Sequence, residues 1–317
     1  MLANNNYYIG IDLGGTRIKA GLVADGKLLA LDVVPAVSAQ GLQASLPLMQ
    51  QTIGQLIHSQ QLDPAGLSGI ALAFPGLVDS VSQRILSTNQ KYNDAIDTDL
   101  PAWVQAQWQV PFFIDNDARM AAVGEWKFGA GQGTDDLVAM TIGTGVGSSA
   151  IINGRLLRGK HFQAGCLGGH MSIHYKGRLC NCGNIGCVEA HASTWSLRET
   201  LLQEPSLNYS LLAQSPRLDF SALFDAAEKK DSLAIRVQQE CMDVWAAGVI
   251  NLIHAYDPDV VVIGGGVMKS AAIILPYIQE KVARHAWTPW GTVNIRASNL
   301  TEEAGILGAV YCLQHQL

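Results

Sequence analysis

The sequence predicts an α/β protein built of two similar halves, because one strand-turn-strand pattern occurs twice and apolar strands repeatedly end in glycine clusters. The first copy consists of Gly15-Thr16, a strand over 17–24, Asp25-Gly26 and Lys27-Leu28-Leu29. The second copy lies 128 positions later and consists of Gly143-Thr144, a strand over 145–152, Asn153-Gly154 and Arg155-Leu156-Leu157. Asp-Gly and Asn-Gly pairs favour the tight turn of a β-hairpin. A repeat at this distance indicates a duplicated half and not a solenoid.

The first half is expected to contain both strands and helices. In chain order we expect hairpin strands over 7–34, an amphipathic helix over 41–60, strands over 68–74 and 110–115, and a helix over 118–128. The two later strands lead to Pro75-Gly76 and to Asp117, and Gly129 is a typical residue for the end of the helix.

The second half opens with the repeated hairpin and continues into a segment rich in cysteine and histidine. A largely helical region is expected over 193–256, followed by a buried strand over 260–263. A last helix is expected to start near Glu302-Glu303, because acidic side chains suit the positive N-terminus of a helix.

Three glycine-rich turns each follow an apolar strand, namely Gly14-Gly15-Thr16, Gly143-Thr144-Gly145 and Gly264-Gly265-Gly266. Successive backbone N–H groups in such turns can hold a phosphate. Thr16 adds a hydroxyl donor and Lys19 adds a cation on the outgoing strand. One such turn is as well explained as an ordinary hairpin connection, but three strand-terminal clusters favour phosphate binding.

Two common nucleotide-binding motifs do not fit. The sequence contains no P-loop string of the form Gly-x-x-x-x-Gly-Lys-Ser/Thr. A dinucleotide-binding turn leads into a helix. After Gly15, however, Ile18, Ala20 and Leu22 alternate with Arg17, Lys19 and Gly21, which predicts a strand.

Composition bounds the class of protein. The chain has 317 residues, of which 48% are apolar and 15% are charged, so a well-packed protein of about two domains is expected. The net charge of −6 argues against a nucleic-acid partner. No apolar run reaches membrane-spanning length and the first residues lack a signal pattern, so we expect a cytoplasmic protein without a membrane partner.

Three of the six cysteines, Cys180, Cys182 and Cys187, lie within eight positions. In a reducing compartment this spacing favours a metal site over a disulfide, and three thiolates with one histidine are a common structural zinc set. His170 and His174 are both candidates for the fourth ligand. We favour His170, because the two preceding glycines would let its side chain reach inward. The alternative is a group of reduced, buried cysteines.

Two carboxylates are candidates for chemistry. Asp117 lies where a strand runs into a helix, a position that keeps a carboxylate ionised. A lone aspartate there is more often an N-cap, but the phosphate-binding turns give a reason for a general base that accepts a hydroxyl proton. Asp12, at the mouth of the first glycine turn, suits Mg²⁺ contact, and its alternative role is to cap the turn.

At this point the sequence resembles the ROK family of sugar kinases, which has an actin-like (ribonuclease H-like), hexokinase-like ATPase fold. The resemblance covers nearly the whole chain. Its motifs are Asp12-Leu13-Gly14-Gly15-Thr16-Arg17-Ile18-Lys19, Phe74-Pro75-Gly76-Leu77-Val78-Asp79, Asn116-Asp117-Ala118, Gly143-Thr144-Gly145-Val146-Gly147, Gly169-His170, the three-cysteine run with Gly186-Cys187-Val188-Glu189, and Gly264-Gly265-Gly266.

The resemblance implies a two-lobed α/β fold with internal duplication and an inter-lobe cleft. Residues 1–118 with a C-terminal helix over about 300–317 would form the smaller lobe, and residues 119–299 the larger lobe with the zinc motif. It also implies ATP, Mg²⁺ and a structural Zn²⁺ as cofactors, a sugar as substrate, and a homodimer.

The resemblance also implies roles for individual residues. Asp117 would be the base that deprotonates a sugar hydroxyl, most often O6. The sugar pocket would be lined by Gly76, Asn89, Asn116, Asp117, His170 and Glu189. The nucleotide would be held by Asp12, Gly14, Gly15, Thr16, Lys19, Gly143, Thr144, Gly145, Gly265 and Gly266. The zinc ligands would be His170, Cys180, Cys182 and Cys187.

Two residues depart from the family pattern. Leu167 stands where members carry a glutamate that faces the sugar, so a more apolar or roomier pocket is expected, open to glycosides, disaccharides or amino sugars. Arg119 stands where asparagine is usual.

Two other functions compete with a sugar kinase. A sugar-responsive regulator would carry a DNA-binding segment before the first glycine turn, whereas this sequence reaches Asp12 almost at once. A catalytically silent sugar-binding protein is suggested by Leu167, and the presence of Asp12, Lys19 and Asp117 argues against it.

Overall fold

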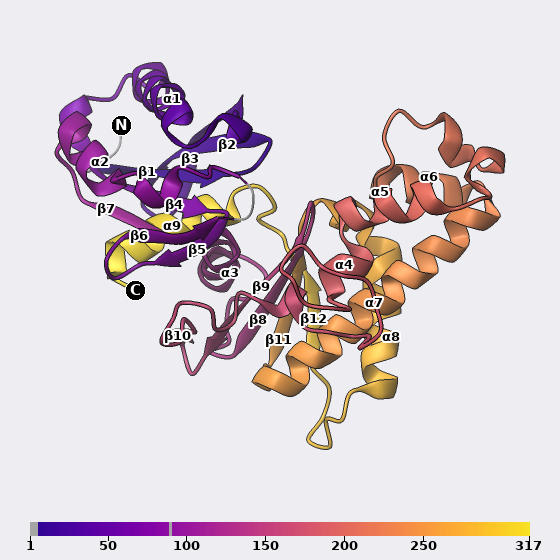
Figure 1. Ribbon diagram of the computed structural model, residues 1–317. Coiled ribbons are helices and arrows are strands. Elements are labelled where there is room, and N and C mark those ends of the chain that lie inside the picture. Colours follow the sequence, from indigo (N-terminus) through magenta and orange to yellow (C-terminus); the bar gives the residue numbers. More distant parts are fainter. Residues whose placement is uncertain (1–5, 89–90) are drawn as a thin grey trace. The chain divides into compact units, whose positions relative to one another are not determined.

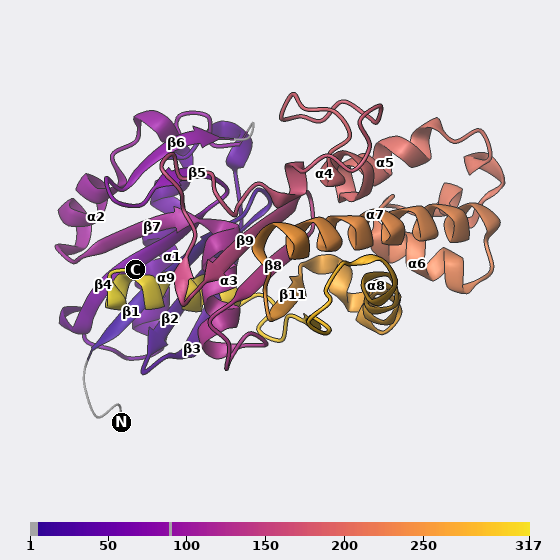
Figure 2. The same cartoon turned by 90° about the horizontal axis from the view of Figure 1, so that it is seen from below.

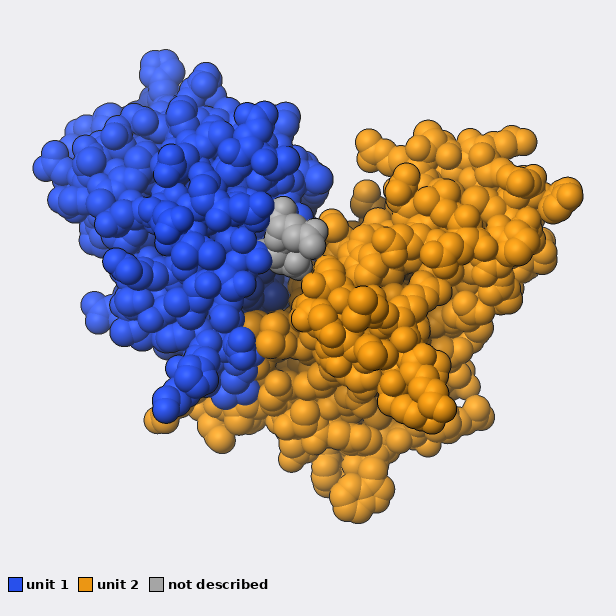
Figure 3. Space-filling model, in the orientation of Figure 1, with its two compact units in different colours: residues 1–133, 156–164, 299–317 blue, residues 134–155, 165–298 orange. Residues whose placement is uncertain are grey.

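The computed structural model describes residues 6–88 and 91–317, and it has the expected α/β architecture (Figure 1). The chain divides into two compact units (Figure 3). Unit 1 comprises residues 1–133, 156–164 and 299–317, and unit 2 comprises residues 134–155 and 165–298. In the described part of the chain, no helix combines the length and the apolar character that a membrane span requires.

The elements that the sequence predicted are present with similar bounds, and the structure adds others that it did not predict. Unit 1 contains strands β1 (Tyr7–Leu13), β2 (Arg17–Ala24), β3 (Lys27–Pro35), β4 (Leu67–Phe74), β5 (Gly76–Asp79), β6 (Arg84–Thr88) and β7 (Phe112–Asn116), and helices α1 (Leu46–Ser59), α2 (Leu100–Trp108), α3 (Asp117–Phe128) and α9 (Ala304–His315). Unit 2 contains strands β8 (Leu137–Ile142), β9 (Val146–Ile152), β11 (Val260–Gly264) and β12 (Asn294–Ala297), and helices α4 (Val188–Ala192), α5 (Thr194–Gln203), α6 (Phe220–Glu228), α7 (Ser232–Tyr256) and α8 (Ala271–His285). The short strand β10 (Arg155–Leu156) contains the point where the chain passes from unit 2 to unit 1.

Each unit is built on a five-stranded sheet, and the two sheets share one topology. Their strand orders are β3-β2-β1-β4-β7 and β10-β9-β8-β11-β12. In each sheet the first strand of the unit pairs antiparallel with its hairpin partner and parallel with a later strand, which in turn pairs parallel with the last one. This correspondence, strand for strand, confirms the internal duplication expected from the repeated hairpin.

The two hairpins differ at their glycine turns. The last residue pair of the first hairpin is Leu13 with Ile18, so residues 14–17 form the connection. The last pair of the second hairpin is Ile142 with Val146, so residues 143–145 form it. The first turn is therefore longer by one residue, although the strands on either side match.

Helix α1 begins later than the sequence suggested, at Leu46 instead of near residue 41. Gly41 has a φ of +98°, which a right-handed helix does not allow, and short 3₁₀ turns precede the helix. The buried side of α1, which includes Met49, Ile53 and Leu56, packs into the core of unit 1 against the sheet.

Helices α3 and α9 cross closely in unit 1, although they are far apart in the sequence. A side chain at Gly124 would collide with the carbonyl of Ala304, and one at Gly308 would collide with the carbonyl of Met120, so only glycine allows this approach. The boundary expected between residues 118 and 119 lies inside α3, which belongs whole to unit 1 together with α9.

Helix α3 also binds backbone segments near the points where the chain passes between units. The buried carboxylate of Glu125 accepts hydrogen bonds from the backbone N–H of Ala130 at 2.8 Å and of Leu300 at 3.1 Å. The chain passes from unit 1 to unit 2 after residue 133 and returns before residue 299. Both segments are therefore fastened to α3 within unit 1.

In unit 2 the long helix α7 runs beside α8 and α6 (Figure 2). Trp245 of α7 is fully buried, and its indole N–H donates to the carbonyl of Ala192 at 2.8 Å. The expected helical region over 193–256 is confirmed as α5, α6 and α7, with short 3₁₀ turns over 207–209 and 211–214 between α5 and α6.

Candidate functional site

The candidate base lies at the carboxyl edge of the sheet of unit 1, where β7 runs directly into α3. Asn116, not Asp117, is the N-cap of α3, because its side-chain oxygen accepts from the N–H of Arg119 at 3.2 Å. The amide of Asn116 donates to the carbonyl of Gly76 and to the carboxylate of Asp117, both at 3.0 Å. The N-cap explanation for Asp117 therefore does not apply. Gly76, Asn116 and Asp117 are brought together as the sequence suggested.

The surroundings of Asp117 shift the pKa of its carboxyl toward neutral pH. Burial, together with the nearby negative charge of Asp12, raises the pKa of the Asp117 carboxyl to about 6. The backbone N–H of Ala118 and the ammonium group of Lys91 act in the opposite direction on this pKa. A carboxylate with a pKa near the working pH is suited to general base catalysis.

The first glycine turn is fastened through its carbonyl groups. The hydroxyl of Tyr92 donates to the carbonyl of Gly14 at 2.7 Å, and that of Ser38 donates to the carbonyl of Gly15 at 2.6 Å. The carbonyl of Thr16 accepts from the N–H of Ala36 at 3.0 Å. The N–H groups of Gly15 and Thr16 have no hydrogen-bond partner among the residues that the structure describes, so they are available as donors.

Lys19 lies beside this turn in an ion pair that the sequence did not reveal. Its ammonium group is 2.9 Å from the carboxylate of Asp12, its register partner across the hairpin. The charges of these two expected nucleotide-binding residues therefore largely offset each other.

The second glycine turn is fastened by a carboxylate. Glu189, which is 5% exposed, accepts from the N–H of Val146 at 2.7 Å and from the indole N–H of Trp195 at 3.2 Å. The N–H of Thr194 donates to the carbonyl of Gly143 at 3.0 Å. The resemblance implied a sugar-binding role for Glu189, and the structure shows that its carboxylate supports the turn at residues 143–145.

The third glycine cluster lies next to the second turn. Gly264 ends β11 and is the parallel register partner of Thr141 on β8. Gly265 has a φ of +93°, and a side chain there would collide with the carbonyl of Ile142. Glycine is therefore required at Gly265. The structure brings together residues 143–145 and Gly265-Gly266, the expected nucleotide-binding residues of unit 2.

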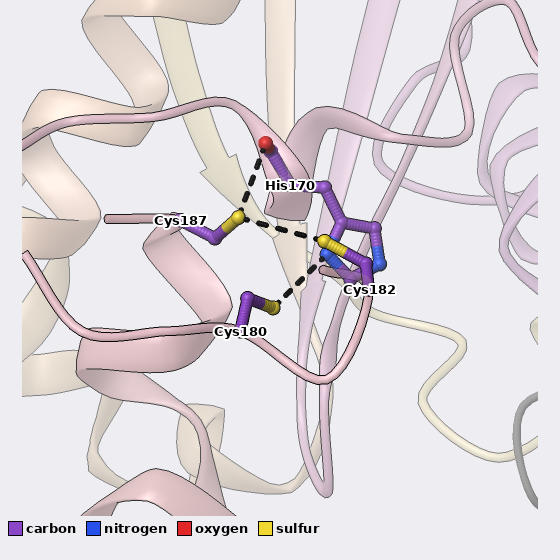
Figure 4. A group of neighbouring side chains, drawn as sticks. All are labelled: His170, Cys180, Cys182 and Cys187. Carbon is purple, nitrogen blue, oxygen red and sulfur yellow. Dashed lines mark hydrogen bonds between the residues drawn. The ribbon is translucent and has the colours of Figure 1, made fainter. Parts of the chain in front are cut away.

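Four potential metal ligands gather in unit 2 (Figure 4). They are His170, Cys180, Cys182 and Cys187, and their ligand atoms all lie within 4.8 Å of one another. His170 ends a short 3₁₀ helix over Gly168–His170, and the described part of the chain places His170 in this cluster and not His174.

The spacing of these atoms fits a tetrahedral zinc ion. Zinc bonds of about 2.3 Å to sulfur and about 2.0–2.1 Å to nitrogen place two sulfurs about 3.8 Å apart, and a sulfur and a nitrogen about 3.5 Å apart. The Sγ atoms of Cys182 and Cys187 are 3.8 Å apart, and Nδ1 of His170 is 3.6 Å from Sγ of Cys180. With four protein ligands, no coordination position is left for a substrate.

Leu167 directly precedes the short helix that carries His170, and its side chain is 43% exposed. An apolar side chain that is exposed next to a candidate sugar ligand is consistent with the apolar or roomier pocket expected from the sequence.

Arg119 has a structural role that the sequence did not suggest. Its guanidinium group is fully buried, pairs with Asp115 at 3.2 Å, and donates to the carbonyls of Phe162 and Ala164 at 2.8 and 3.0 Å. Arg158 pairs with the other oxygen of Asp115 at 2.8 Å. Two residues after the candidate base, Arg119 thus fastens the segment 156–164 to unit 1.

The structure thus gathers the expected residues into two groups. Unit 1 holds Asp12, Gly14, Gly15, Thr16, Lys19, Gly76, Asn116 and Asp117, whereas unit 2 holds Gly143, Thr144, Gly145, His170, Glu189, Gly265 and Gly266. Asn89, an expected sugar ligand, lies outside the described residues. Sequence reasoning missed Lys91 and Tyr92. The available signal was their position, because a cation and an aromatic residue follow the expected sugar ligand Asn89 within three residues.

Comparisons with known proteins agree with this geometry. The profile of the ROK family matches residues 8–316. A glucokinase from Thermotoga maritima is 32% identical over 316 residues, which cover 98% of this chain and 98% of that protein. A xylose repressor from Bacillus subtilis is 28% identical over 303 residues, which cover 95% of this chain and 75% of the repressor.

A solved structure extends the likeness to three dimensions. The crystal structure of a ROK family glucokinase from Streptomyces griseus in complex with glucose and AMPPNP has a TM-score of 0.81 and 28% identity. The match covers 98% of this chain and 100% of that one. This likeness confirms the actin-like α/β fold. Since the family profile and the Thermotoga maritima relative both span nearly the whole sequence, the chain belongs to the ROK family.

Proposed function

We propose that this protein is an ATP-dependent sugar kinase that phosphorylates a sugar hydroxyl, most often O6 of a hexose, an amino sugar or a glycoside. The observation that carries the proposal is Asp117. Its carboxyl belongs to the first residue of α3 and has a pKa of about 6, raised by burial and by the charge of Asp12. The full-length likeness to glucokinases supports the same reaction.

In this reaction Asp117 accepts the proton of the sugar hydroxyl while the oxygen of that hydroxyl attacks the γ-phosphorus of ATP. The bond between the γ-phosphorus and the bridging oxygen breaks, and ADP leaves with that oxygen. Asn116 holds the carboxylate of Asp117 through the 3.0 Å hydrogen bond, which limits its rotation. Because catalysis of phosphoryl transfer depends on alignment and charge, a fixed base of suitable pKa is what the protein must supply.

The nucleotide would be held from its phosphate side by the glycine turns. The N–H groups of Gly15 and Thr16, which have no partner within residues 6–88 and 91–317, suit phosphate oxygens. Gly143, Thr144, Gly145, Gly265 and Gly266 would serve the rest of the nucleotide. Mg²⁺ would be held by Asp12 and the phosphates, where it neutralises charge that develops on the transferred group.

The cysteine cluster would hold a structural zinc ion, since four ligands of suitable spacing leave no open position for catalysis. The metal would fix His170 and the start of α4. Glu189 follows Cys187 by two residues, so the same metal would set the position of the residue that fastens the second glycine turn.

The sugar would contact Gly76, Asn89, Asn116, Asp117, His170 and Glu189. Leu167 offers no hydrogen bond where a glutamate is usual in the family, so the C1–C2 side of the sugar would meet an apolar surface. We therefore propose that sugars substituted or linked at this end are accepted at least as well as plain glucose.

A coupled assay of ADP release over a panel of hexoses, amino sugars, glycosides and disaccharides tests the proposal. The expected result is sugar-dependent ADP release with at least one class, and a phosphorylated product in mass spectrometry. If no sugar in the panel supports turnover while ATP and sugar both bind, the kinase proposal is wrong.

The likeness to a xylose repressor favours a second candidate, a sugar-responsive or silent sugar-binding protein. Thermal-shift screening of the same panel separates the two functions. Stabilisation by a sugar without turnover would support the second candidate, whereas turnover would exclude the silent form. The expected homodimer stays a prediction that light scattering can test.

A further inference from the structure

A second lysine lies at the first glycine turn, and none of the motifs of the sequence analysis includes it. Lys91 directly precedes Tyr92, which is fully buried. The N–H of Tyr92 donates to the carbonyl of Ser38 at 2.9 Å, and its hydroxyl donates to the carbonyl of Gly14. The residue that follows Lys91 is therefore bound to the turn directly through its side chain, and its backbone is bound to Ser38, whose hydroxyl donates to the carbonyl of Gly15.

The side chain of Lys91 extends over the bare backbone of Gly15. A Cβ atom at Gly15 would lie 2.6 Å from both Cε and Nζ of Lys91, closer than real side chains approach. Glycine at this position thus leaves room for a cation and not only for a phosphate. The N–H of Gly15 itself has no hydrogen-bond partner among the described residues.

Lys91 has no ion-pair partner among the residues that the structure describes. None of the described carboxylates lies within ion-pair distance of its ammonium group, whereas Lys19 is paired with Asp12 at 2.9 Å. The charged groups that act on Asp117 are Asp12 from β1, which raises its pKa, and Lys91, which lowers it. Lys91 therefore lies close enough to influence the candidate base as well as the turn.

We infer that Lys91 is an additional catalytic residue whose ammonium group binds the phosphoryl group as it passes from the nucleotide to the sugar oxygen. The inference rests on the proposed kinase function. An ammonium group that lies over the phosphate-binding turn is suited to stabilise the negative charge that spreads over the phosphoryl oxygens during transfer. A lysine suits this place as a compact point charge on a flexible stem.

Kinetics of Lys91→Gln and Lys91→Arg test this role, with Lys27→Gln as the control, since Lys27 is an exposed lysine of β3 in the same unit. The glutamine variant is expected to lose roughly 100-fold or more in kcat, and the arginine variant to retain a substantial part of the rate. Unchanged thermal unfolding midpoints show that the variants are folded. Turnover of Lys91→Gln equal to that of wild type would overturn the inference.

Calorimetry separates this role from general nucleotide binding. If Lys91 contacts the phosphate that is transferred, Lys91→Gln weakens binding of AMPPNP in the presence of sugar but leaves ADP binding unchanged. An equal loss for both nucleotides would assign Lys91 to the phosphates that stay, and would refute the inference.

The pH profile adds a readout that a purely structural role would not move. Without the positive charge the pKa of Asp117 rises, so the acidic limb of kcat/KM for Lys91→Gln shifts to higher pH, by about half a unit or more. An unshifted limb together with normal turnover would contradict the assigned position of Lys91. If the wild-type protein shows no turnover, the proposed function is wrong. If Lys91→Gln retains the wild-type rate, only the inference about Lys91 is wrong.

Discussion

The glycine turns after β1 and after β8 occupy the same place in the two duplicated sheets. They differ in the charge of the side chains that hold them. The first turn is fastened by neutral hydroxyls from Tyr92 and Ser38, and Lys91 lies over it. The second turn is fastened by the carboxylate of Glu189. The supporting residues come from segments outside the repeated hairpins. Duplication thus preserved the backbone, while later segments gave each turn its own electrostatic character.

The sharpest test of this difference is the candidate base, Asp117, which belongs to unit 1. Asp117→Asn removes the proton acceptor while keeping the size of the side chain, so kcat should fall by about 10³-fold, within the usual range for a general base. Sugar binding, measured by calorimetry, should stay close to that of wild type. The exposed Asp97→Asn is the matched control. Near-normal turnover of Asp117→Asn would show that Asp117 is not the base, so unit 1 would no longer be distinguished by a catalytic carboxylate.

Loss of the metal should damage one unit and spare the other. Cys182→Ser should abolish stoichiometric zinc in elemental analysis and destabilise unit 2, because metal binding contributes directly to folding. Hydrogen exchange should therefore rise in residues 165–203 while β1, β4 and β7 stay protected. Cys166→Ser, outside the cluster, should retain the metal. A native protein without zinc would refute the assignment of the cluster.

Two conservative variants compare how much the hydrogen bonds to each glycine turn contribute to stability. Glu189→Gln places an amide N–H against one of two donors and should cost about 1–3 kcal/mol of unfolding free energy, whereas Tyr92→Phe removes one neutral hydrogen bond and should cost about 1 kcal/mol. Urea unfolding measures both changes. A larger loss of unfolding free energy for Tyr92→Phe than for Glu189→Gln would contradict the expectation that the carboxylate stabilises its turn more than the hydroxyl does.

The pH dependence of turnover tests the candidate base without a substitution. Because burial raises the pKa of Asp117 to about 6, its carboxylate is protonated at lower pH and cannot accept the hydroxyl proton. The value of kcat/KM should level off above pH 7 and fall about tenfold for each unit below about pH 6. A flat profile down to pH 5 would mean that another group is the base.

Local features were the most predictable from the sequence. The hairpins follow from alternating apolar residues and Asp-Gly or Asn-Gly turns, and the strand before Asp117 from its continuous apolar run. The metal cluster follows from the spacing of three cysteines, since ligands close in sequence need little help from the fold. These signals lie within about ten residues of each other.

Features that depend on distant contacts could not be predicted. The assignment of α3 to unit 1 depends on its close packing with α9, where Gly124 and Gly308 admit the crossing. The position of Lys91 depends on a buried tyrosine that contacts a turn 78 residues away. No local pattern encodes such contacts.

The anchoring of backbone to α3 has a mechanical consequence. Glu125 fastens the segments that leave unit 1 after residue 133 and return at residue 299, while Arg119 and Asp115 fasten the loop 156–164 at both of its ends. Every passage of the chain between the units is thus tied to the helix whose first residue is Asp117, or to the strand just before it. A force on any of the four segments that connect the units would therefore be transmitted to the short stretch of backbone that carries the candidate base.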